Sequence, residues 1–167
     1  NKLVPIIKYI CSSKSKKFLF GGSQGIGKSS FINIISKTIE KFYNKKILLL
    51  SLDNYYLSKK QRLLLSKNTH NLLITRGVPG THDIGKLVKN IKKFNHGNYP
   101  ISTPLFDKLI DDTSKTKKII ETKCDILFLE GWCCGSSEIP KKFLYKNINN
   151  LERVNDPNNQ WRDFYNN

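Results

Sequence analysis

The feature that most constrains this chain is a glycine-rich stretch at residues 22–29, which fits the pattern G-x-x-x-x-G-K-[ST]. In this pattern the backbone N–H groups of the loop surround phosphate oxygens, the lysine reaches the outer phosphates and the hydroxyl holds Mg²⁺. The pattern therefore predicts that a nucleoside triphosphate binds here. The residues expected to contact it are Gly22, Ser23, Gln24, Gly25, Ile26, Gly27, Lys28, Ser29 and Ser30.

The sequence on both sides of the loop has the strand and the helix that such a loop requires. Residues 17–20 are a short apolar run, and apolar residues recur at helical spacing after Lys28. A helix that begins at Lys28 directs its N–H groups and the positive end of its dipole at the loop. A turn without a ligand is the alternative, but an ordinary turn would not require this set of residues. The face predicted to be buried comprises Phe31, Ile34, Ile35, Ile39 and Phe42.

An acidic residue, Asp53, follows the second predicted strand. Residues 47–52 form a continuous apolar run, which is typical of a parallel strand covered on both faces. With the first strand and helix it completes a β-α-β unit, which we expect to be right-handed. Ligands of parallel α/β sheets bind at the carboxyl ends of the strands, so Asp53 would accept a proton from an attacking hydroxyl or orient Mg²⁺. A helix N-cap is the alternative role, but the position favours chemistry.

A third apolar run, residues 125–129, ends in Glu130 and Gly131. This is the expected form of a Walker-B strand, whose carboxylate lies beside the phosphate loop. We expect Glu130 to hold Mg²⁺ together with Ser29, directly or through water. The three strands and their connections predict an α/β fold, a P-loop NTPase with three α/β/α layers and a mostly parallel sheet.

The loop at residues 75–83 contains two glycines, a proline, an arginine, a histidine and an aspartate. Its backbone must be specifically shaped, but turn chemistry alone does not decide whether the shape serves a substrate. Asp83 would equally well cap the following helix, whose apolar face comprises Ile84, Leu87, Val88 and Ile91. Residues 59–68 have helical composition, with Leu63, Leu64 and Leu65 as the expected buried side.

We interpret residues 1–167 as one domain that is incomplete at its C-terminus and begins with a helix and linker at residues 1–16. Residues 144–151 are expected to be helical, and residues 152–167 to begin a lid-like segment. Arginines beyond a Walker-B strand sometimes close over the transferred phosphoryl group. For Arg153 and Arg162 this role and that of a solvated surface side chain are both open.

The formal net charge of +16 suggests nucleic acid, but only four of the 29 basic residues are arginine and the lysines are spread through the chain. Arginine is the usual choice for recognition of phosphate and guanine, so we expect no nucleic-acid partner. Four cysteines lack the spacing of a zinc site, and reduced thiols are the default. No apolar run approaches bilayer length, so the sequence predicts a cytoplasmic protein without a membrane partner.

Four stretches together resemble the P-loop D-glycerate 3-kinase family, within the wider phosphoribulokinase and uridine kinase group. They are residues 51–57, residues 75–83, residues 104–108 and residues 129–133, and the string Arg76-Gly-Val-Pro-Gly-Thr-His-Asp83 is the most specific of them. The similarity runs from about Phe18 to the last residue. Members of the family are longer than this chain, and the remaining part would supply further strands and much of the adenine pocket.

The resemblance implies an ATP-dependent kinase domain that, with Mg²⁺, phosphorylates the 3-hydroxyl of D-glycerate to give 3-phosphoglycerate. Lys28, Asp53 and Glu130 would be the catalytic residues, with Asp53 as the base. The substrate residues would be Asp53, Tyr56, Arg76, Thr81, His82, Asp83 and Lys108. A related kinase that acts on a nucleoside, pantothenate or a sugar phosphate is the first alternative. A non-catalytic ATP-binding module is the second.

Overall fold

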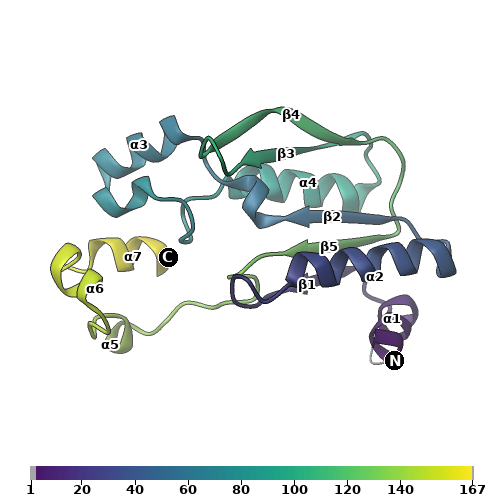
Figure 1. The fold of residues 1–167 in the computed structure, drawn as a ribbon, viewed down its shortest axis with the longest axis horizontal. Coiled ribbons are helices and arrows are strands. Elements are labelled where there is room, and N and C mark those ends of the chain that lie inside the picture. Colours follow the sequence, from purple (N-terminus) through teal and green to yellow (C-terminus); the bar gives the residue numbers. More distant parts are fainter. Residues whose placement is uncertain (1–2, 167) are drawn as a thin grey trace.

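Three parallel strands form the central sheet of the computed structural model, which describes residues 3–166 (Figure 1). Their order is β1 (Lys17–Phe20), β5 (Ile126–Glu130) and β2 (Ile47–Ser51). Each outer strand pairs with β5, so that Phe20 and Ser51 both lie beside Glu130. The three strands predicted from apolar runs are confirmed, and their carboxyl ends meet at one edge of the sheet.

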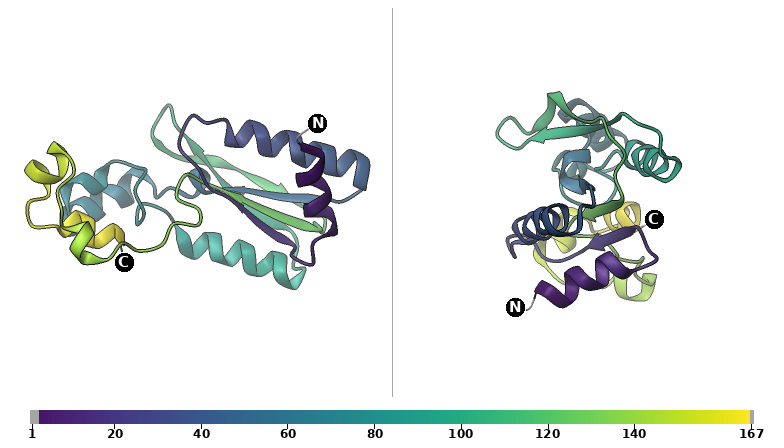
Figure 2. Two further views of the ribbon diagram at one scale, coloured as in Figure 1. Left: turned by 90° about the horizontal axis from the view of Figure 1, so that it is seen from below. Right: turned by 90° about the vertical axis from the view of Figure 1, so that its right-hand side faces the viewer.

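Helices cover both faces of this sheet, which confirms the predicted three-layer architecture (Figure 2). Side chains alternate along a strand. Ile126 and Phe128 pack against isoleucines of α1 (Leu3–Ser12) and α2 (Lys28–Tyr43), whereas Leu127 packs on the opposite face in a cluster with Leu87 and other residues of α4 (Ile84–His96). Near-complete burial on both faces explains why the central strand β5 is almost uniformly apolar, whereas the edge strand β1 leaves Leu19 exposed.

The buried faces of the helices differ in part from the predicted ones. In α2 the structure buries Ile32, Ile35 and Ile39, whereas Phe31, Ile34 and Phe42 are exposed. The apolar residues of this helix cover a wider stripe than the one that meets the sheet, so periodicity alone does not identify the buried residues. In α4 the prediction of Leu87 is confirmed, but Ile84 and Val88 are exposed.

Helix α3 (Lys59–Asn68) has the predicted bounds but not the predicted buried side. Leu63 and Leu64 are exposed, and the buried residue of the helix is Arg62. The guanidinium of Arg62 makes four hydrogen bonds, which offset the cost of removing its charge from water. The position of the leucines therefore predicted the wrong buried face for α3.

An antiparallel hairpin, β3 (Ile101–Asp107) and β4 (Asp112–Ile120), follows α4 and was not predicted. Pro104 lies within β3, and the register shifts between Pro104 and Phe106. Prolines are uncommon inside strands, which hid the pattern. The strand β3 contacts η1 (Leu52–Tyr55), so the turn of the hairpin lies near the carboxyl end of β2.

Three short helices close the described chain: α5 (Lys141–Leu144), α6 (Asn150–Asn155) and α7 (Gln160–Asn166). They lie near α3 and η2 (Asn71–Ile74), away from the sheet (Figure 1). The predicted single helix at 144–151 is wrong. Arg162 is not a solvated surface residue, because it is buried and its Nε lies 2.9 Å from Asp156 Oδ2. Arg153 is exposed and donates to Asn150 on its own helix.

The four cysteines are free thiols, as predicted. Within residues 3–166 no helix is both long and apolar enough to cross a lipid bilayer.

The segment after β2 is joined to the loop before α4 through Tyr56 and His82. The two residues form an isolated antiparallel bridge, and their rings stack with centroids 4.5 Å apart. His82 is 6% exposed. Burial lowers the pKa of His82 to about 4, although the charge of Asp53 acts in the opposite direction. The imidazole is therefore neutral at physiological pH.

Truncation of Ile35, which is fully buried between α2 and the sheet, should destabilise the fold. We expect Ile35→Ala to lower the free energy of unfolding by about 3 kcal/mol, because it removes buried methyl groups and leaves a cavity. The neighbouring Ile34→Ala removes an exposed side chain and should cost about 0.5 kcal/mol. Denaturant titration measures both, and equal losses would contradict the assigned face.

The neutral His82 predicts a pH-dependent stability. An unfolded histidine has a pKa of about 6.5, so protonation favours the unfolded chain, and stability is lost as the pH falls from about 6.5 to about 4. Between pH 7.5 and 5 the loss through this residue should be about 2 kcal/mol. His82→Phe keeps a ring against Tyr56 and should show a shallower decline in denaturant titrations. The same pH slope in both proteins would contradict a buried neutral imidazole.

Candidate functional site

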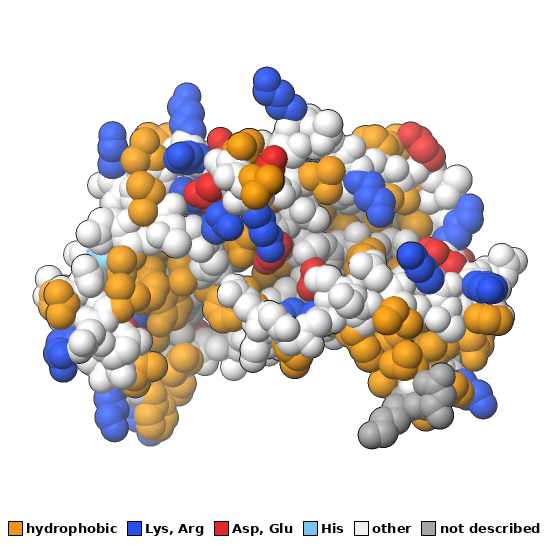
Figure 3. Space-filling model, in the orientation of Figure 1, with side chains coloured by type: hydrophobic (Ala, Val, Ile, Leu, Met, Phe, Trp, Pro, Cys, Tyr) orange, Lys and Arg blue, Asp and Glu red, His pale blue; other side chains and the backbone are white. Residues whose placement is uncertain are grey.

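A cavity of about 890 Å³ lies at the carboxyl edge of the sheet. In the space-filling view a hollow near the middle of the molecule is bordered by acidic and basic side chains (Figure 3). Residues of the glycine-rich loop form one side of the cavity, which we call the donor side because the loop is predicted to bind the phosphates of a nucleotide. We call the opposite side, with Asp53, Arg76 and Lys108, the acceptor side. The full lining is Gln24, Gly25, Gly27, Lys28, Ser29, Ser30, Asp53, Tyr56, Lys59, Ile74, Thr75, Arg76, Gly77, Lys108, Asp111, Glu130, Gly131 and Trp132.

The donor side begins at the glycine-rich loop and the first turn of α2. Gly27 precedes the helix with φ of 89°, a left-handed conformation that glycine adopts without strain. The Lys28 ammonium donates to the carbonyl oxygens of Gly22 and Ser23, each at 2.7 Å. Gly22, Ser23 and Ile26 are outside the lining of the cavity, whereas the other six predicted loop residues belong to it. Lys28 and the helix N-terminus therefore present positive charge to the cavity.

Two hydroxyl groups and one carboxylate meet where the strands end. Ser29 donates to Glu130 Oε1 at 3.3 Å, and Ser51 on the neighbouring strand donates to the same oxygen. Hydroxyl and carboxylate oxygens suit Mg²⁺, which is usually held by one or two protein groups plus substrate phosphates. Within residues 3–166 no group of three or more His, Cys, Asp or Glu side chains could enclose a metal ion. The donor set thus fits Mg²⁺ that arrives with a nucleotide.

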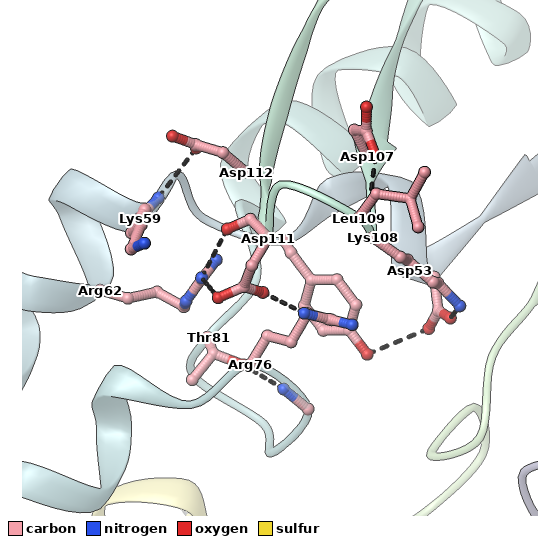
Figure 4. Close-up of polar contacts among 12 residues, drawn as sticks. Asp53, Lys59, Arg62, Arg76, Thr81, Asp107, Lys108, Leu109, Asp111 and Asp112 are labelled. Atoms are coloured by element: carbon pink, nitrogen blue, oxygen red, sulfur yellow. Dashed lines mark hydrogen bonds and ion pairs between the residues drawn. The ribbon is translucent and has the colours of Figure 1, made fainter.

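Asp53 projects from η1, directly after β2, and is held from two sides (Figure 4). Its Oδ2 lies 2.7 Å from Lys108 Nζ, and its Oδ1 accepts a hydrogen bond of 3.1 Å from the Tyr56 hydroxyl. Asp53 does not cap the next α-helix, because Ser58 forms the capping box of α3 with Gln61. A carboxylate oriented in this way is available to a hydroxyl group in the cavity.

We predicted that four residues of the Arg76 to Asp83 string contact the substrate, namely Arg76, Thr81, His82 and Asp83. Of these four, only Arg76 lines the cavity. Thr81 is buried, and its hydroxyl donates to Val78 O at 2.7 Å within the loop. His82 stacks on Tyr56, and Asp83 accepts from the backbone N–H of Lys86 as the N-cap of α4. Their positions make them supports of the loop and of Tyr56, while Arg76 is the side chain that reaches the cavity.

Sequence reasoning missed several lining residues. Asp111 lies in the turn of the unpredicted hairpin, so nothing in the local pattern pointed to it. Trp132 follows Glu130 and Gly131, and its indole N–H donates to Gly77 O at 2.8 Å, which ties the end of β5 to the Arg76 loop. The place of Trp132 just after a parallel strand was a signal that we did not use.

Comparison with known proteins shows the family to which this chain belongs. Residues 4–155 match the model of the KAP family P-loop domain. The chain is 35% identical over 134 residues to the probable ATP-dependent kinase TDA10 of Saccharomyces cerevisiae. The match covers 72% of this chain and 46% of the yeast protein. It is 29% identical over 113 residues to the pantothenate kinase of Pasteurella multocida, which covers 66% of this chain and 34% of that enzyme.

Among solved structures, the D-glycerate 3-kinase of Cryptococcus neoformans matches with a TM-score of 0.67 and 25% sequence identity. The match covers 85% of this chain and 53% of that one. This chain therefore spans about half the length of the fungal kinases that it matches. The relatives are kinases, and this chain belongs to the KAP family of P-loop domains.

Proposed function

We propose that this chain carries the phosphate-binding and acceptor-binding parts of an ATP-dependent small-molecule kinase, and that D-glycerate is its acceptor. The observation that carries the proposal is the composition of the cavity. Phosphate-loop residues line one side of it, and two carboxylates with three cationic side chains line the other. A nucleotide phosphate and an acceptor hydroxyl would meet between them.

The proposed reaction depends mainly on positioning. Lys28 and the backbone N–H groups of the loop would bind the β- and γ-phosphates and balance the charge that spreads over the transferred group. Ser29 and Glu130 would hold Mg²⁺, which when bound neutralises charge on the same phosphates. Burial of Glu130 between Ser29 and Ser51 fixes the direction of its carboxylate.

Asp53 would take the proton of the attacking hydroxyl. The contacts from Tyr56 and Lys108 hold its two oxygens in place, and Tyr56 is itself fixed by the His82 stack. Burial raises the pKa of Tyr56, and the nearby charge of Asp53 raises it further, so the phenol remains a hydrogen-bond donor. The base is thus oriented before the acceptor binds.

The acceptor side favours an anion. Lys59, Arg76 and Lys108 contribute three cations there, against Asp53 and Asp111. D-Glycerate pairs a carboxylate with hydroxyl groups, and the resemblance of residues 76–83 to the glycerate kinases supports it. Pantothenate, also a carboxylate with hydroxyl groups, is the second candidate, because the pantothenate kinase of P. multocida is a relative. Uridine lacks an anionic group and fits this side less well.

An ADP-release assay with the full-length protein tests the proposed function. The acceptors are D-glycerate, pantothenate, uridine and ribulose 5-phosphate, and we expect turnover to be fastest with D-glycerate. Lys28→Ala should abolish turnover and weaken ATP binding, because it removes the cation that contacts the outer phosphates. ADP release with pantothenate but with no other acceptor would show that the substrate is pantothenate and not D-glycerate. ATP binding without ADP release for any acceptor would favour a non-catalytic module.

The role of Asp53 has a separate test. Asp53→Asn keeps the shape of the side chain but cannot take a proton, so kcat should fall by about 10²- to 10⁴-fold. The affinity for ATP, measured by calorimetry, should stay within about twofold, because Asp53 lies on the acceptor side. A fully active Asp53→Asn enzyme would exclude Asp53 as the base.

A further inference from the structure

Asp111 joins two arginines that come from different parts of the chain (Figure 4). It occupies the turn between β3 and β4, where its φ of 55° is in the left-handed region. One carboxylate oxygen pairs with Arg62 Nη2 at 2.6 Å, and the other pairs with Arg76 Nη1. Arg62 belongs to α3, whereas Arg76 follows η2. The carboxylate therefore bridges a buried guanidinium and one that lines the cavity.

Arg62 is a fixed point of this arrangement. It is 1% exposed, and its Nε and Nη1 donate to the carbonyl oxygens of Ile74 at 3.0 Å and Leu57 at 2.6 Å. Its Nη2 donates to both the carbonyl and the carboxylate of Asp111. A buried charge with this many partners cannot leave them without a large cost. Arg62 thus holds the turn of the hairpin and the carboxylate of Asp111 in place.

Arg76 is the more exposed of the two arginines. Its side chain is 30% exposed, and its guanidinium lies 5.4 Å from the centroid of the Phe106 ring, which also contacts Arg62 at 5.6 Å. A free arginine side chain loses up to about 2 kcal/mol of rotamer entropy when it is ordered. The pair with Asp111 and the Phe106 contact impose much of that order in advance. Arginine has five N–H donors, so the pair through Nη1 is compatible with a second contact to an anion.

We propose that Asp111 is a positioning residue, which uses buried Arg62 as its anchor and holds Arg76 toward the acceptor side of the cavity. The inference rests on the proposed function, because an anionic acceptor is what Arg76 would bind. A guanidinium ordered in advance lowers the cost of ordering on binding. Asp111 would therefore act on the affinity for the acceptor, and not on ATP or on the proton transfer at Asp53.

The direct test is Asp111→Asn in the full-length protein with D-glycerate as acceptor. Asparagine tolerates the left-handed φ, so the change removes the charge without backbone strain. We expect the KM for D-glycerate to rise about tenfold, the size of one lost charge-assisted contact, with kcat and the KM for ATP within about twofold. Asp112→Asn is the matched control, since this neighbouring carboxylate accepts from the backbone N–H groups of Lys59 and Thr113. The control should keep the wild-type KM.

A double-mutant cycle separates positioning from general support of the fold. If Asp111 acts through Arg76, Asp111→Asn should add no further rise in KM in an Arg76→Ala background. A tenfold rise in both backgrounds would overturn the proposal.

Nitrogen-15 NMR of the arginine side chains gives a readout that does not need turnover. In the wild type the Arg76 guanidinium should rotate slowly, as that of Arg62 should, and Asp111→Asn should make the rotation of Arg76 faster. Fast rotation in the wild type, or no change in a folded variant, would overturn the inference. If no acceptor is phosphorylated, the proposed function fails and the NMR result still decides whether Asp111 holds Arg76.

Discussion

The site depends on the parallel pairing of β5 with strands on both of its sides. This register places Phe20, Ser51 and Glu130 at the same level of the sheet. The chain leaves β1 into the glycine-rich loop, leaves β2 into η1 and leaves β5 into Gly131 and Trp132. Three segments that are far apart in the sequence thus enter one cavity. A shift of one residue in the register would turn the side chain of Glu130 to the other face of the sheet.

Close packing at this edge leaves little freedom. The backbone N–H of Gly131 donates to Phe20 O at 3.1 Å, and a Cβ at Gly131 would lie 2.8 Å from Leu52 Cβ. A larger residue at this position would force β5 away from the segment that carries Asp53. The edge of the sheet from which the glycine-rich loop departs is therefore closely packed. The acceptor side is held by contacts between side chains. Tyr56, which stacks on His82, donates a hydrogen bond to Asp53. Asp111, which pairs with buried Arg62, also pairs with Arg76.

The parts of the site that follow from local chemistry could be predicted from the sequence. The phosphate loop is one continuous stretch, and Asp53 and Glu130 each follow an apolar strand, so the rule that parallel strands end at one edge brings them together. Asp111 could not be found in this way, because its role depends on a hairpin that Pro104 obscured and on Arg62, whose burial reverses the usual expectation for arginine. The string at residues 76–83 was identified as important, yet only Arg76 and Gly77 line the cavity, and Arg76 is the one of these with a side chain that can bind an anion.

The central claim is that one cavity holds a nucleotide phosphate and an anionic acceptor side by side. Paramagnetic relaxation measures this directly. With Mn²⁺ in place of Mg²⁺ and a non-hydrolysable ATP analogue bound to the full-length protein, the proton relaxation of D-glycerate should increase strongly. With Lys28→Ala protein it should fall to the rate of the protein-free mixture that contains the same ATP analogue and Mn²⁺. Relaxation of D-glycerate that is the same with and without the wild-type protein would show that the acceptor does not bind beside the nucleotide, and would contradict the account.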